Sequence, residues 1–254
     1  MTRLALFGSE GRMGVLLRQC AEEAGAYSVV ARYDRIAPGL PASEPLPADV
    51  DAVVDFSSAA AWQDLGSLLE GNSVPLVSGT TGTGSEGKGM LELWAGSRAV
   101  FHSANMSRGI HVLCRLTSLA ARLAGESGGG FDLEIVESHH RGKLDSPSGT
   151  ALMLLESWES VIGGGRHVYG RGGEDRPRSP RSSGEVGIHS VRGGDVVGEH
   201  RVLLLGDGER LELGHSATSR RTFALGALAA VDFVMHRSSG LYGMDDLVGG
   251  GVTQ

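Results

Sequence analysis

The N-terminal segment RLALFGSEGRMG, residues 3–14, decides the fold class of this chain. Its first part, Arg3–Phe7, is a short apolar run that ends at a glycine, which is typical of a buried strand. Three glycines spaced GxxGxxG follow, where the helical pattern Met13–Ala24 begins. Glycines at such a turn let a pyrophosphate approach the N-terminus of the helix. The segment therefore predicts a dinucleotide-binding turn, although a glycine turn that serves packing alone has the same spacing.

Strand and helix patterns continue to alternate through the first half of the chain. Further strands are expected at Tyr27–Tyr33, Asp51–Phe56, Pro75–Ser78 and Ala99–His102. Helices are expected at Ala59–Glu70 and Met90–Ser97. This alternation predicts an α/β fold with a Rossmann-like, doubly wound parallel sheet covered by helices on both faces. Ligands in such sheets bind at the carboxyl ends of the strands.

The pattern changes after Ser107, where a smaller α+β domain with a mixed sheet is expected to begin. A long amphipathic helix is predicted at Ile110–Ala124, and a final helix at Thr222–Met235 that packs back on the first domain. Strand-like runs, interpreted as a meander, occupy Asp132–Glu137, Val186–Arg192, His200–Leu205 and Arg210–His215. The arginine-rich stretch Gly163–Ser183 is expected to be a mobile surface loop, long enough for a lid.

Composition limits the classes of partner. The 254 residues are 41% hydrophobic and 21% charged, as in soluble globular proteins. A net charge of −7 argues against nucleic acid as the partner. No apolar run reaches ~18 residues and no signal-peptide pattern is visible, so we expect no membrane span and a cytoplasmic protein. Cys20 and Cys114 lie in apolar patterns without metal-ligand spacing and are expected to be buried free thiols.

An acidic residue strengthens the dinucleotide interpretation. Asp34 ends the second predicted strand, about 20 residues after the glycines, where a carboxylate binds the ribose 2′-hydroxyl of NAD. Arg35, and also Arg12, could instead meet the 2′-phosphate of NADP. NADH and NADPH therefore both stay open.

Two later strand ends carry small polar residues. They are Gly79-Thr80-Thr81-Gly82 and Ala104-Asn105-Met106-Ser107. Backbone groups and small hydroxyls of this kind can border a nicotinamide, although each stretch taken alone is also an ordinary loop.

The stretch ESHHRGKLDSPSGTA, residues 137–151, combines acid–base and anion-binding chemistry. His139 and His140 can donate protons, and Lys143 can pair with a carboxylate. Ser148-Gly149-Thr150 offers hydrogen bonds at the N-terminus of a helix, where anions are favoured. The pattern predicts an anion pocket with an acid beside it, whereas Arg141 is interpreted as a structural or solvated charge.

The glycine-flanked stretch 193–200 is interpreted as turn chemistry. A metal site built from Asp195, Glu199 and His200 is conceivable, but it has no diagnostic spacing, and we expect no metal.

Nearly the whole chain resembles the 4-hydroxy-tetrahydrodipicolinate reductase (dihydrodipicolinate reductase) family of diaminopimelate and lysine biosynthesis. The motifs are GSEGRMG (8–14), DFS (55–57), GTTG (79–82), ANMS (104–107), ESHHRGKLDSPSGTA (137–151), GIHSVRGGDVVGEH (187–200), ERLELGHSATSR (209–220) and GLYGMDDL (240–247). The histidine-rich motif is specific to that family, whereas the glycine turn is not. Three stretches depart from the family pattern, namely Pro38–Pro47, Thr83–Gly89 and Arg171–Ser183.

The resemblance implies a domain for the dinucleotide at 1–107 with 221–254, and a substrate-binding and oligomerisation domain at 108–220. It also implies a cytoplasmic homotetramer that acts on a small dicarboxylate. NADH or NADPH would give a hydride to ring C4, with His139 as general acid and Lys143 as the second catalytic residue. Implied cofactor contacts are Gly8, Ser9, Glu10, Gly11, Arg12, Met13, Asp34, Arg35, Phe56, Gly79, Thr80, Thr81, Ala104, Asn105 and Met106. Implied substrate contacts are Thr81, His140, Lys143, Ser148, Gly149 and Thr150.

Two other functions fit part of this pattern. One is a related NAD(P)H-dependent imine reductase for another small anion. The other is a non-catalytic NAD(P)-binding protein, which has no need of a proton donor such as His139.

Overall fold

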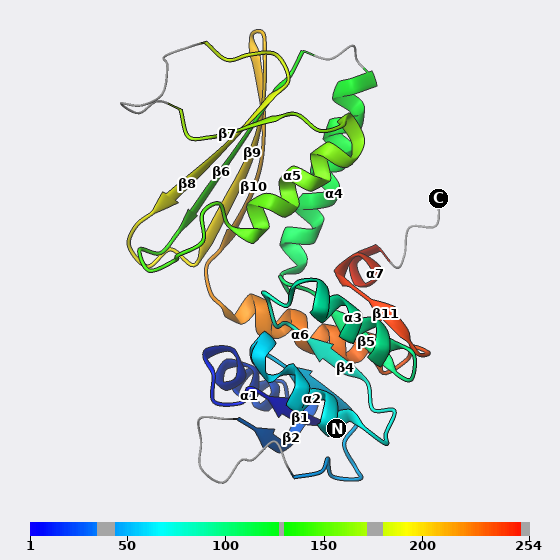
Figure 1. Ribbon diagram of the computed structural model, residues 1–254. Coiled ribbons are helices and arrows are strands. Elements are labelled where there is room, and N and C mark those ends of the chain that lie inside the picture. Colours follow the sequence, from blue (N-terminus) through cyan, green and yellow to red (C-terminus); the bar gives the residue numbers. More distant parts are fainter. Residues whose placement is uncertain (35–43, 127–129, 172–179, 250–254) are drawn as a thin grey trace. The chain divides into compact units, whose positions relative to one another are not determined.

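The computed structural model describes residues 1–34, 44–126, 130–171 and 180–249, and the chain forms two compact units. Unit 1 comprises Met1–Arg108 and Arg220–Gln254, and unit 2 comprises Gly109–Ser219. Figure 1 gives the element labels used below.

Unit 1 contains a six-stranded sheet in which all neighbouring strands are parallel (Figure 1). In spatial order the strands are β11 (Gly240–Tyr242), β5 (Ala99–His102), β4 (Leu76–Ser78), β3 (Ala52–Asp55), β1 (Thr2–Phe7) and β2 (Tyr27–Tyr33). The helices are α1 (Arg12–Ala24), η1 (Ala59–Ala61), α2 (Trp62–Leu69), α3 (Gly84–Ala95), α6 (Arg221–Val234) and α7 (Met244–Gly249). The predicted Rossmann-like sheet is confirmed, and β11 is an edge strand that the sequence analysis does not include.

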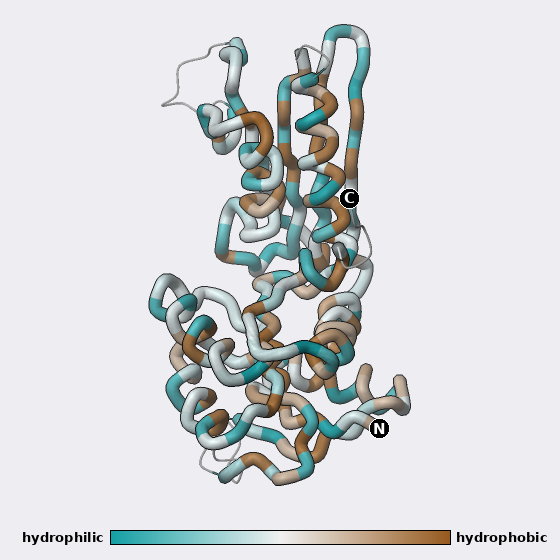
Figure 2. The backbone as a smooth tube through the Cα atoms, turned by 90° about the vertical axis from the view of Figure 1, so that its right-hand side faces the viewer, coloured by the Kyte–Doolittle hydropathy of each residue, from teal (hydrophilic) through white to brown (hydrophobic). Residues whose placement is uncertain are grey.

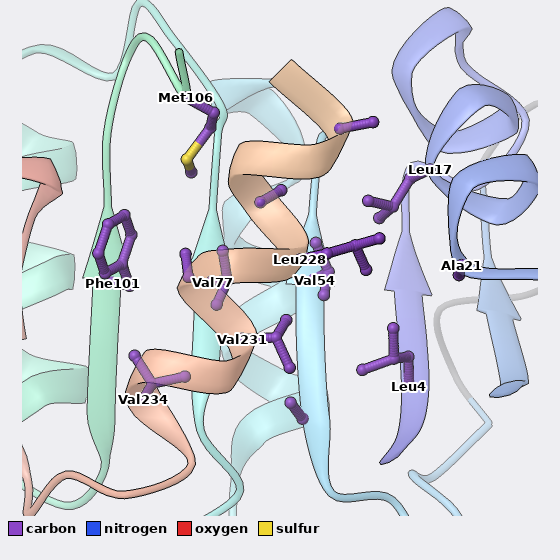
Figure 3. Packing of buried hydrophobic residues seen from close by; sticks show 14 of the residues in the cluster. Leu4, Leu17, Ala21, Val54, Val77, Phe101, Met106, Leu228, Val231 and Val234 are labelled. Atoms are coloured by element: carbon purple, nitrogen blue, oxygen red, sulfur yellow. The ribbon is translucent and has the colours of Figure 1, made fainter. Parts of the chain in front are cut away.

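Both faces of this sheet are buried, which explains the continuous apolar runs in its strands. Leu4 and Leu6 of β1 belong to a core shared with α1 and α6. Ala5 and Phe7, which alternate with them, belong to the core beneath α2 and α3. Figure 3 shows side chains of α6, among them Leu228, lying over the strands within the first of these cores. Because each face must be apolar, the strands show runs of hydrophobic residues rather than alternation.

The strand order places a topological switch at the neighbouring strands β1 and β3. From β1 the chain goes to the edge strand β2 and then returns to β3 on the other side of β1. The two strand ends are in close contact there, since a Cβ on Gly8 would lie 2.7 Å from the carbonyl oxygen of Phe56. Ligands of open α/β sheets bind at the carboxyl ends next to such a switch.

Unit 2 contains a five-stranded mixed sheet. Its strands, in spatial order, are β10 (Glu209–Ala217), β9 (Gly198–Gly206), β6 (Asp132–His139), β8 (Glu185–Arg192) and β7 (Arg166–Tyr169). Its helices are α4 (Arg108–Glu126) and α5 (Gly149–Ile162), and both share a core with the sheet. The predicted mixed sheet is confirmed.

The interpretation of these strands as a meander is wrong. Only β10–β9 and β9–β6 are antiparallel, whereas β6–β8 and β8–β7 are parallel. Parallel neighbours need a crossover connection of a dozen or more residues. The 14-residue helix α5 lies in the connection between β6 and β8 and lets β8 enter parallel to β6.

Regular structure occurs in the expected loop Gly163–Ser183 and in Thr83–Gly89, which departs from the family pattern. Within Gly163–Ser183, residues 166–169 form β7 and pair with β8, whereas residues 172–179 lie outside the described residues. Residues 38–43 of the proline-rich departure also lie outside them. The glycine-rich Thr83–Gly89 is largely the first part of α3, which begins at Gly84 rather than at Met90. A Cβ on Gly87 would lie 2.2 Å from Cβ of Thr83 and 3.1 Å from the Trp62 ring, so close packing outweighs the low helix propensity of glycine.

In the hairpin of β9 and β10, residues 202–205 of β9 are all apolar, whereas Leu211 of β10 lies between charged residues. Figure 2 shows hydrophilic and hydrophobic stretches along the chain. Among the described residues, no helix is long and apolar enough to cross a membrane. Cys20 and Cys114 are buried and free, which confirms the expectation for both thiols.

Candidate active site

The glycine turn, residues 8–14, leads from β1 into α1 in a conformation that depends on its glycines. Gly8 has φ +83°, a region that other residues rarely adopt. Gly11 is the N-cap of α1 and has no side chain with which to cap the helix. The first-turn amides of α1 therefore face the turn without a side-chain cap, as the N-terminus of an anion-binding helix does.

Gly14 gives the sharpest test of the turn. A Cβ on Gly14 would lie 2.3 Å from the carbonyl oxygen of Gly8. We expect Gly14→Ala to displace the turn and to raise the Kd for NADH and for NADPH by at least about tenfold, or ~1.4 kcal/mol. Fluorescence titration of both cofactors measures this.

The matched control is Gly89→Ala in α3, where an added Cβ would meet no atom within 4 Å. This variant should bind both cofactors as the wild type does and should gain roughly 0.5–1 kcal/mol of stability, since it removes a glycine from a helix. Unchanged cofactor affinity in Gly14→Ala would show that the turn does not hold the dinucleotide.

Asp34 lies beside the glycine turn, at the end of β2. Its Oδ2 accepts a hydrogen bond of 2.9 Å from the backbone N–H of Glu10. The Glu10 carboxylate accepts from Ser9 Oγ at 3.0 Å and lies 3.5 Å from the guanidinium of Arg32. Arg35, the other residue expected to decide between the two cofactors, lies outside the described residues.

At the carboxyl ends of β3 and β4, a buried carboxylate that the sequence analysis missed joins the two strands. Asp55 accepts hydrogen bonds from Ser78 Oγ at 2.7 Å, Thr80 Oγ1 at 2.8 Å and Trp62 Nε1 at 3.0 Å. The hydroxyl of Thr80 is therefore turned inward, whereas Thr81 is exposed.

The Phe56 ring lies against Gly79, because a Cβ on Gly79 would lie 2.2 Å from that ring. The signal that could have revealed Asp55 was a charged residue at the end of an otherwise apolar run.

The remaining cofactor candidates follow β5. Ala104 is exposed and Asn105 is half-buried, with its Oδ1 accepting from the Ser107 N–H at 2.8 Å. Met106 is 2% exposed and its side chain belongs to the core beneath α6 (Figure 3). Only the backbone of Met106 is therefore placed to meet a ligand.

In unit 2, Glu137 and His139 form the centre of a polar cluster. They are two residues apart on β6, so their side chains share one face of the sheet. His139 Nδ1 lies 2.5 Å from Glu137 Oε2. Arg192 of β8 donates two hydrogen bonds of 2.7 Å to the same carboxylate, and the Ser148 N–H donates a third of 3.1 Å. We call Glu137, His139, Ser148, Arg192 and His200 the Glu137 cluster.

Charge fixes the protonation of this pair. Burial alone would raise the pKa of Glu137, but hydrogen bonds from Arg192, Ser190, His139 and the Ser148 N–H outweigh it and lower that pKa to about 2. Glu137 is therefore ionised at neutral pH, so His139 Nδ1 carries the proton and donates it to Glu137. Burial lowers the pKa of His139, and Glu137 opposes part of that effect. The arrangement leaves His139 Nε2 as the ring nitrogen that Glu137 does not hold.

Ser148 and His200 complete the Glu137 cluster. Ser148 is the N-cap of α5, and its Oγ accepts from the Ala151 N–H at 3.2 Å, which confirms the helix start predicted there. His200 Nε2 lies 3.2 Å from Ser148 Oγ, and the His200 ring packs edge-on against His139 at 5.1 Å between centroids. Gly149 and Thr150 form the first turn of α5, where amides and the helix dipole favour an anion.

The other charged residues of the predicted motif lie along the turn after β6. Lys143 Nζ is 2.8 Å from Asp145 Oδ1, and the Lys143 N–H donates to the carbonyl of His140. Arg141 is exposed, as expected of a solvated charge, and its N–H donates to the carbonyl of Gly194.

Sequence reasoning gave no role to Glu137 or Arg192, and it considered His200 only as a metal ligand. Glu137 had a readable signal, because a glutamate two residues before a histidine in a strand shares its face. The other two reach the cluster through strand register, with Arg192 opposite His139 and His200 opposite Glu137.

Among the described residues, no group of three or more His, Cys, Asp or Glu side chains is arranged to hold a metal ion. The metal site conceived from Asp195, Glu199 and His200 therefore has no support in the structure, since His200 faces Ser148 instead.

Both halves of the chain match known family models. Residues 2–106 match the model described as dihydrodipicolinate reductase, N-terminus, and residues 109–248 match its C-terminus. A 4-hydroxy-tetrahydrodipicolinate reductase of Clostridium botulinum is 39% identical and covers 98% of this chain and 99% of its own. One from Caldanaerobacter subterraneus is 40% identical, with 98% of each chain covered.

A solved structure of dipicolinate-bound dihydrodipicolinate reductase from Paenisporosarcina sp. TG-14 superimposes with a TM-score of 0.73 at 25% identity. The comparison covers 97% of this chain and 99% of that one.

Proposed function

Because this chain belongs to the dihydrodipicolinate reductase family, we propose that unit 1 holds NADH or NADPH and that unit 2 holds a dicarboxylate and protonates it. The protein reduces 4-hydroxy-tetrahydrodipicolinate to tetrahydrodipicolinate in diaminopimelate and lysine biosynthesis. Substrate, NAD(P)H and a proton give tetrahydrodipicolinate, NAD(P)⁺ and water. The observation that carries the proposal is the Glu137 cluster. In it the Glu137 carboxylate binds both His139 Nδ1 and the backbone N–H of Ser148 at the start of α5.

The residues of unit 1 fit a dinucleotide. Close contact between Gly14 and the Gly8 carbonyl brings the backbone of the turn to the start of α1, where the pyrophosphate binds. Asp34, which accepts a hydrogen bond from the Glu10 N–H, binds the ribose hydroxyls in this proposal. When bound, the cofactor supplies a hydride. The strand ends at Gly79–Thr81 and Ala104–Met106 border the nicotinamide in this proposal.

The residues of unit 2 fit a dianion. Lys143 offers a positive charge, and Ser148, Gly149 and Thr150 offer hydroxyl and amide donors at the N-terminus of α5. His140 lies one residue beyond His139, where the chain leaves β6. These groups bind the carboxylates, and Thr81 of unit 1 is a further substrate contact in this proposal.

His139 supplies the proton. Loss of the 4-hydroxyl as water leaves a conjugated imine, and hydride addition at ring C4 gives an enamine that must be protonated on carbon. Glu137 holds His139 Nδ1–H and stabilises the imidazolium, so that Nε2–H is the donor. Burial makes this imidazolium a stronger acid than a solvated one. Lys143 balances the charge of the substrate during the transfer.

The test is an assay in which purified protein receives enzymatically generated 4-hydroxy-tetrahydrodipicolinate with NADH or with NADPH. Loss of the absorbance of the reduced nicotinamide with at least one cofactor is expected. Turnover of a cyclic imine without two carboxylates, and none of the dicarboxylate, would assign the chain to a different substrate. Cofactor binding without any turnover would make it a non-catalytic dinucleotide-binding protein.

A homotetramer, assembled through unit 2, and a cytoplasmic location belong to the same proposal and follow from the family resemblance. Light scattering on the purified protein tests the first, because a monomer would contradict it.

A further inference from the structure

Ser148 has one hydrogen to donate and two lone pairs with which to accept. One lone pair receives the Ala151 N–H at 3.2 Å, which is the cap of α5. The second neighbour of its Oγ is His200 Nε2, also at 3.2 Å. The direction of this second hydrogen bond decides what the Ser148 hydroxyl can still do. If the Ser148 O–H donates to Nε2, it has no hydrogen left for a ligand, whereas if Nε2–H donates, the O–H must point elsewhere.

His200 is buried in a way that selects its tautomer. It is 3% exposed, and its Nδ1 is a buried atom without a hydrogen-bond partner among the described residues. A proton on Nδ1 would bury an N–H donor without an acceptor, and such orphaned donors are rare in proteins. A proton on Nε2 can instead be donated to Ser148 Oγ, and the buried Nδ1 then carries only a lone pair. The neutral imidazole with Nε2–H is therefore the favoured form.

The surroundings of His200 keep its ring neutral. Burial, with the neighbouring His139, His215 and Lys143, lowers the pKa of His200 to about 4, and the opposing effect of Glu137 is smaller. The ring also packs edge-on against His139 at 5.1 Å, so it is held in place from a second side. A positive charge on His200 would repel a positive charge on the neighbouring His139 and would disfavour the protonated form of that residue.

We propose that His200 is a positioning residue that fills the second lone pair of Ser148 and so makes the Ser148 hydroxyl an obligate donor to a carboxylate of the substrate. This rests on the proposed function, in which Ser148 binds the dicarboxylate. The consequence is ligand specificity, because a hydroxyl that can only donate binds an anionic oxygen but not a ligand group that is itself only a donor. His200 acts through Ser148 and transfers no proton to the substrate.

The test compares the Kd of dipicolinate, measured by calorimetry in the presence of NADH, between two replacements of His200. The amide nitrogen of glutamine can occupy the place of Nε2, whereas leucine has no donor. His200→Leu is expected to raise the Kd about tenfold, because Ser148 then loses its fixed hydrogen bond to the charged carboxylate of dipicolinate, and one such bond contributes about that much. His200→Gln should stay within about threefold of the wild type, since it restores the donor.

A double-mutant cycle shows whether His200 acts through Ser148. In a Ser148→Ala background, His200→Leu should cause no further loss of dipicolinate affinity. An equal loss in both backgrounds, or a wild-type Kd in His200→Leu, would overturn the proposal. Cofactor titration and thermal unfolding of each variant identify any that fail to fold.

A tautomer measurement on the wild-type protein is independent of turnover and of the variants. Long-range ¹H–¹⁵N correlation of the histidine side chains, with His200 assigned by its loss in His200→Gln, should show a protonated Nε2 and a bare Nδ1. A proton on Nδ1 would overturn the inference. A wild-type protein that neither binds dipicolinate nor reduces 4-hydroxy-tetrahydrodipicolinate would instead contradict the proposed function. The tautomer of His200 would still test the role of that residue.

Discussion

His139→Gln should lower kcat by about 10²- to 10⁴-fold, the range that a general acid contributes, while the Kd of NADH and NADPH stays unchanged. Glutamine can keep a hydrogen bond to Glu137, which now holds His139 Nδ1 at 2.5 Å, but it cannot protonate an enamine. Single-turnover kinetics and cofactor titration measure the two quantities separately.

Two matched controls make this result specific. His236→Gln changes an exposed histidine of unit 1 and should leave kcat and KM unchanged. His140→Gln changes the neighbour on the chain and should raise KM for the dicarboxylate more than it lowers kcat. A parallel loss of turnover and cofactor affinity in His139→Gln would instead point to a structural role of His139.

Arg192→Met should cost about 3–5 kcal/mol of folding stability, since it leaves a buried carboxylate without its cation. The Glu137 side chain is 0% exposed and receives both guanidinium hydrogen bonds of Arg192 at 2.7 Å. Methionine keeps the length of the side chain but not its charge. Denaturant unfolding at neutral pH measures the loss.

The control for this prediction is Arg201→Met, which makes the same change in the exposed ion pair with Glu212. Exposed pairs contribute about 0–1 kcal/mol, so this variant should be nearly neutral. Equal costs for Arg192→Met and Arg201→Met would contradict the account of Glu137 as a buried, charge-paired carboxylate.

The same carboxylate gives a pH dependence with a definite sign. The pKa of Glu137 is lowered from 4.5 to about 2 in the folded protein, so the folded state binds fewer protons than the unfolded state in this range. Its contribution to stability is present above pH 4.5 and is lost as the pH falls toward 2. In Arg192→Met this part of the acid dependence should shrink, because the main group that lowers the pKa is gone.

The fold of unit 1 could be predicted from the sequence because its signals are local. A strand, a glycine turn and a helix follow one another within residues 3–24, and the next strand ends at Asp34. The edge strand β11 was not predicted, because its three residues are too few to show a recognisable strand pattern.

Unit 2 was harder, because its sheet depends on pairing between distant segments. The strands of β6 and β9 were recognised, but whether β8 runs parallel to β6 depends on the path of α5 and not on the strand residues themselves. Gly165, which precedes β7, shows the same limit, since an added Cβ there would lie 2.6 Å from the carbonyl oxygen of Gly184, a residue distant in sequence.

The site shows the same division between local and distant information. The motif 137–151 identified His139 and the helix start at Ser148 from neighbouring residues. Arg192 and His200 join them only through the register of β8 and β9 with β6, which no single strand reveals. The motif therefore offered His139 and His140 as candidate proton donors, and the family resemblance selected His139. The groups that surround His139 required the structure.

Transfer of deuterium from the cofactor tests the central claim most directly. The wild-type protein would be given NADH or NADPH carrying two deuterium atoms at nicotinamide C4, with 4-hydroxy-tetrahydrodipicolinate, and the product analysed by mass spectrometry and NMR. One deuterium at ring C4 of tetrahydrodipicolinate is expected, together with a solvent-derived proton on the neighbouring carbon. Oxidised cofactor with an unlabelled product, or deuterium at another ring position, would contradict the account.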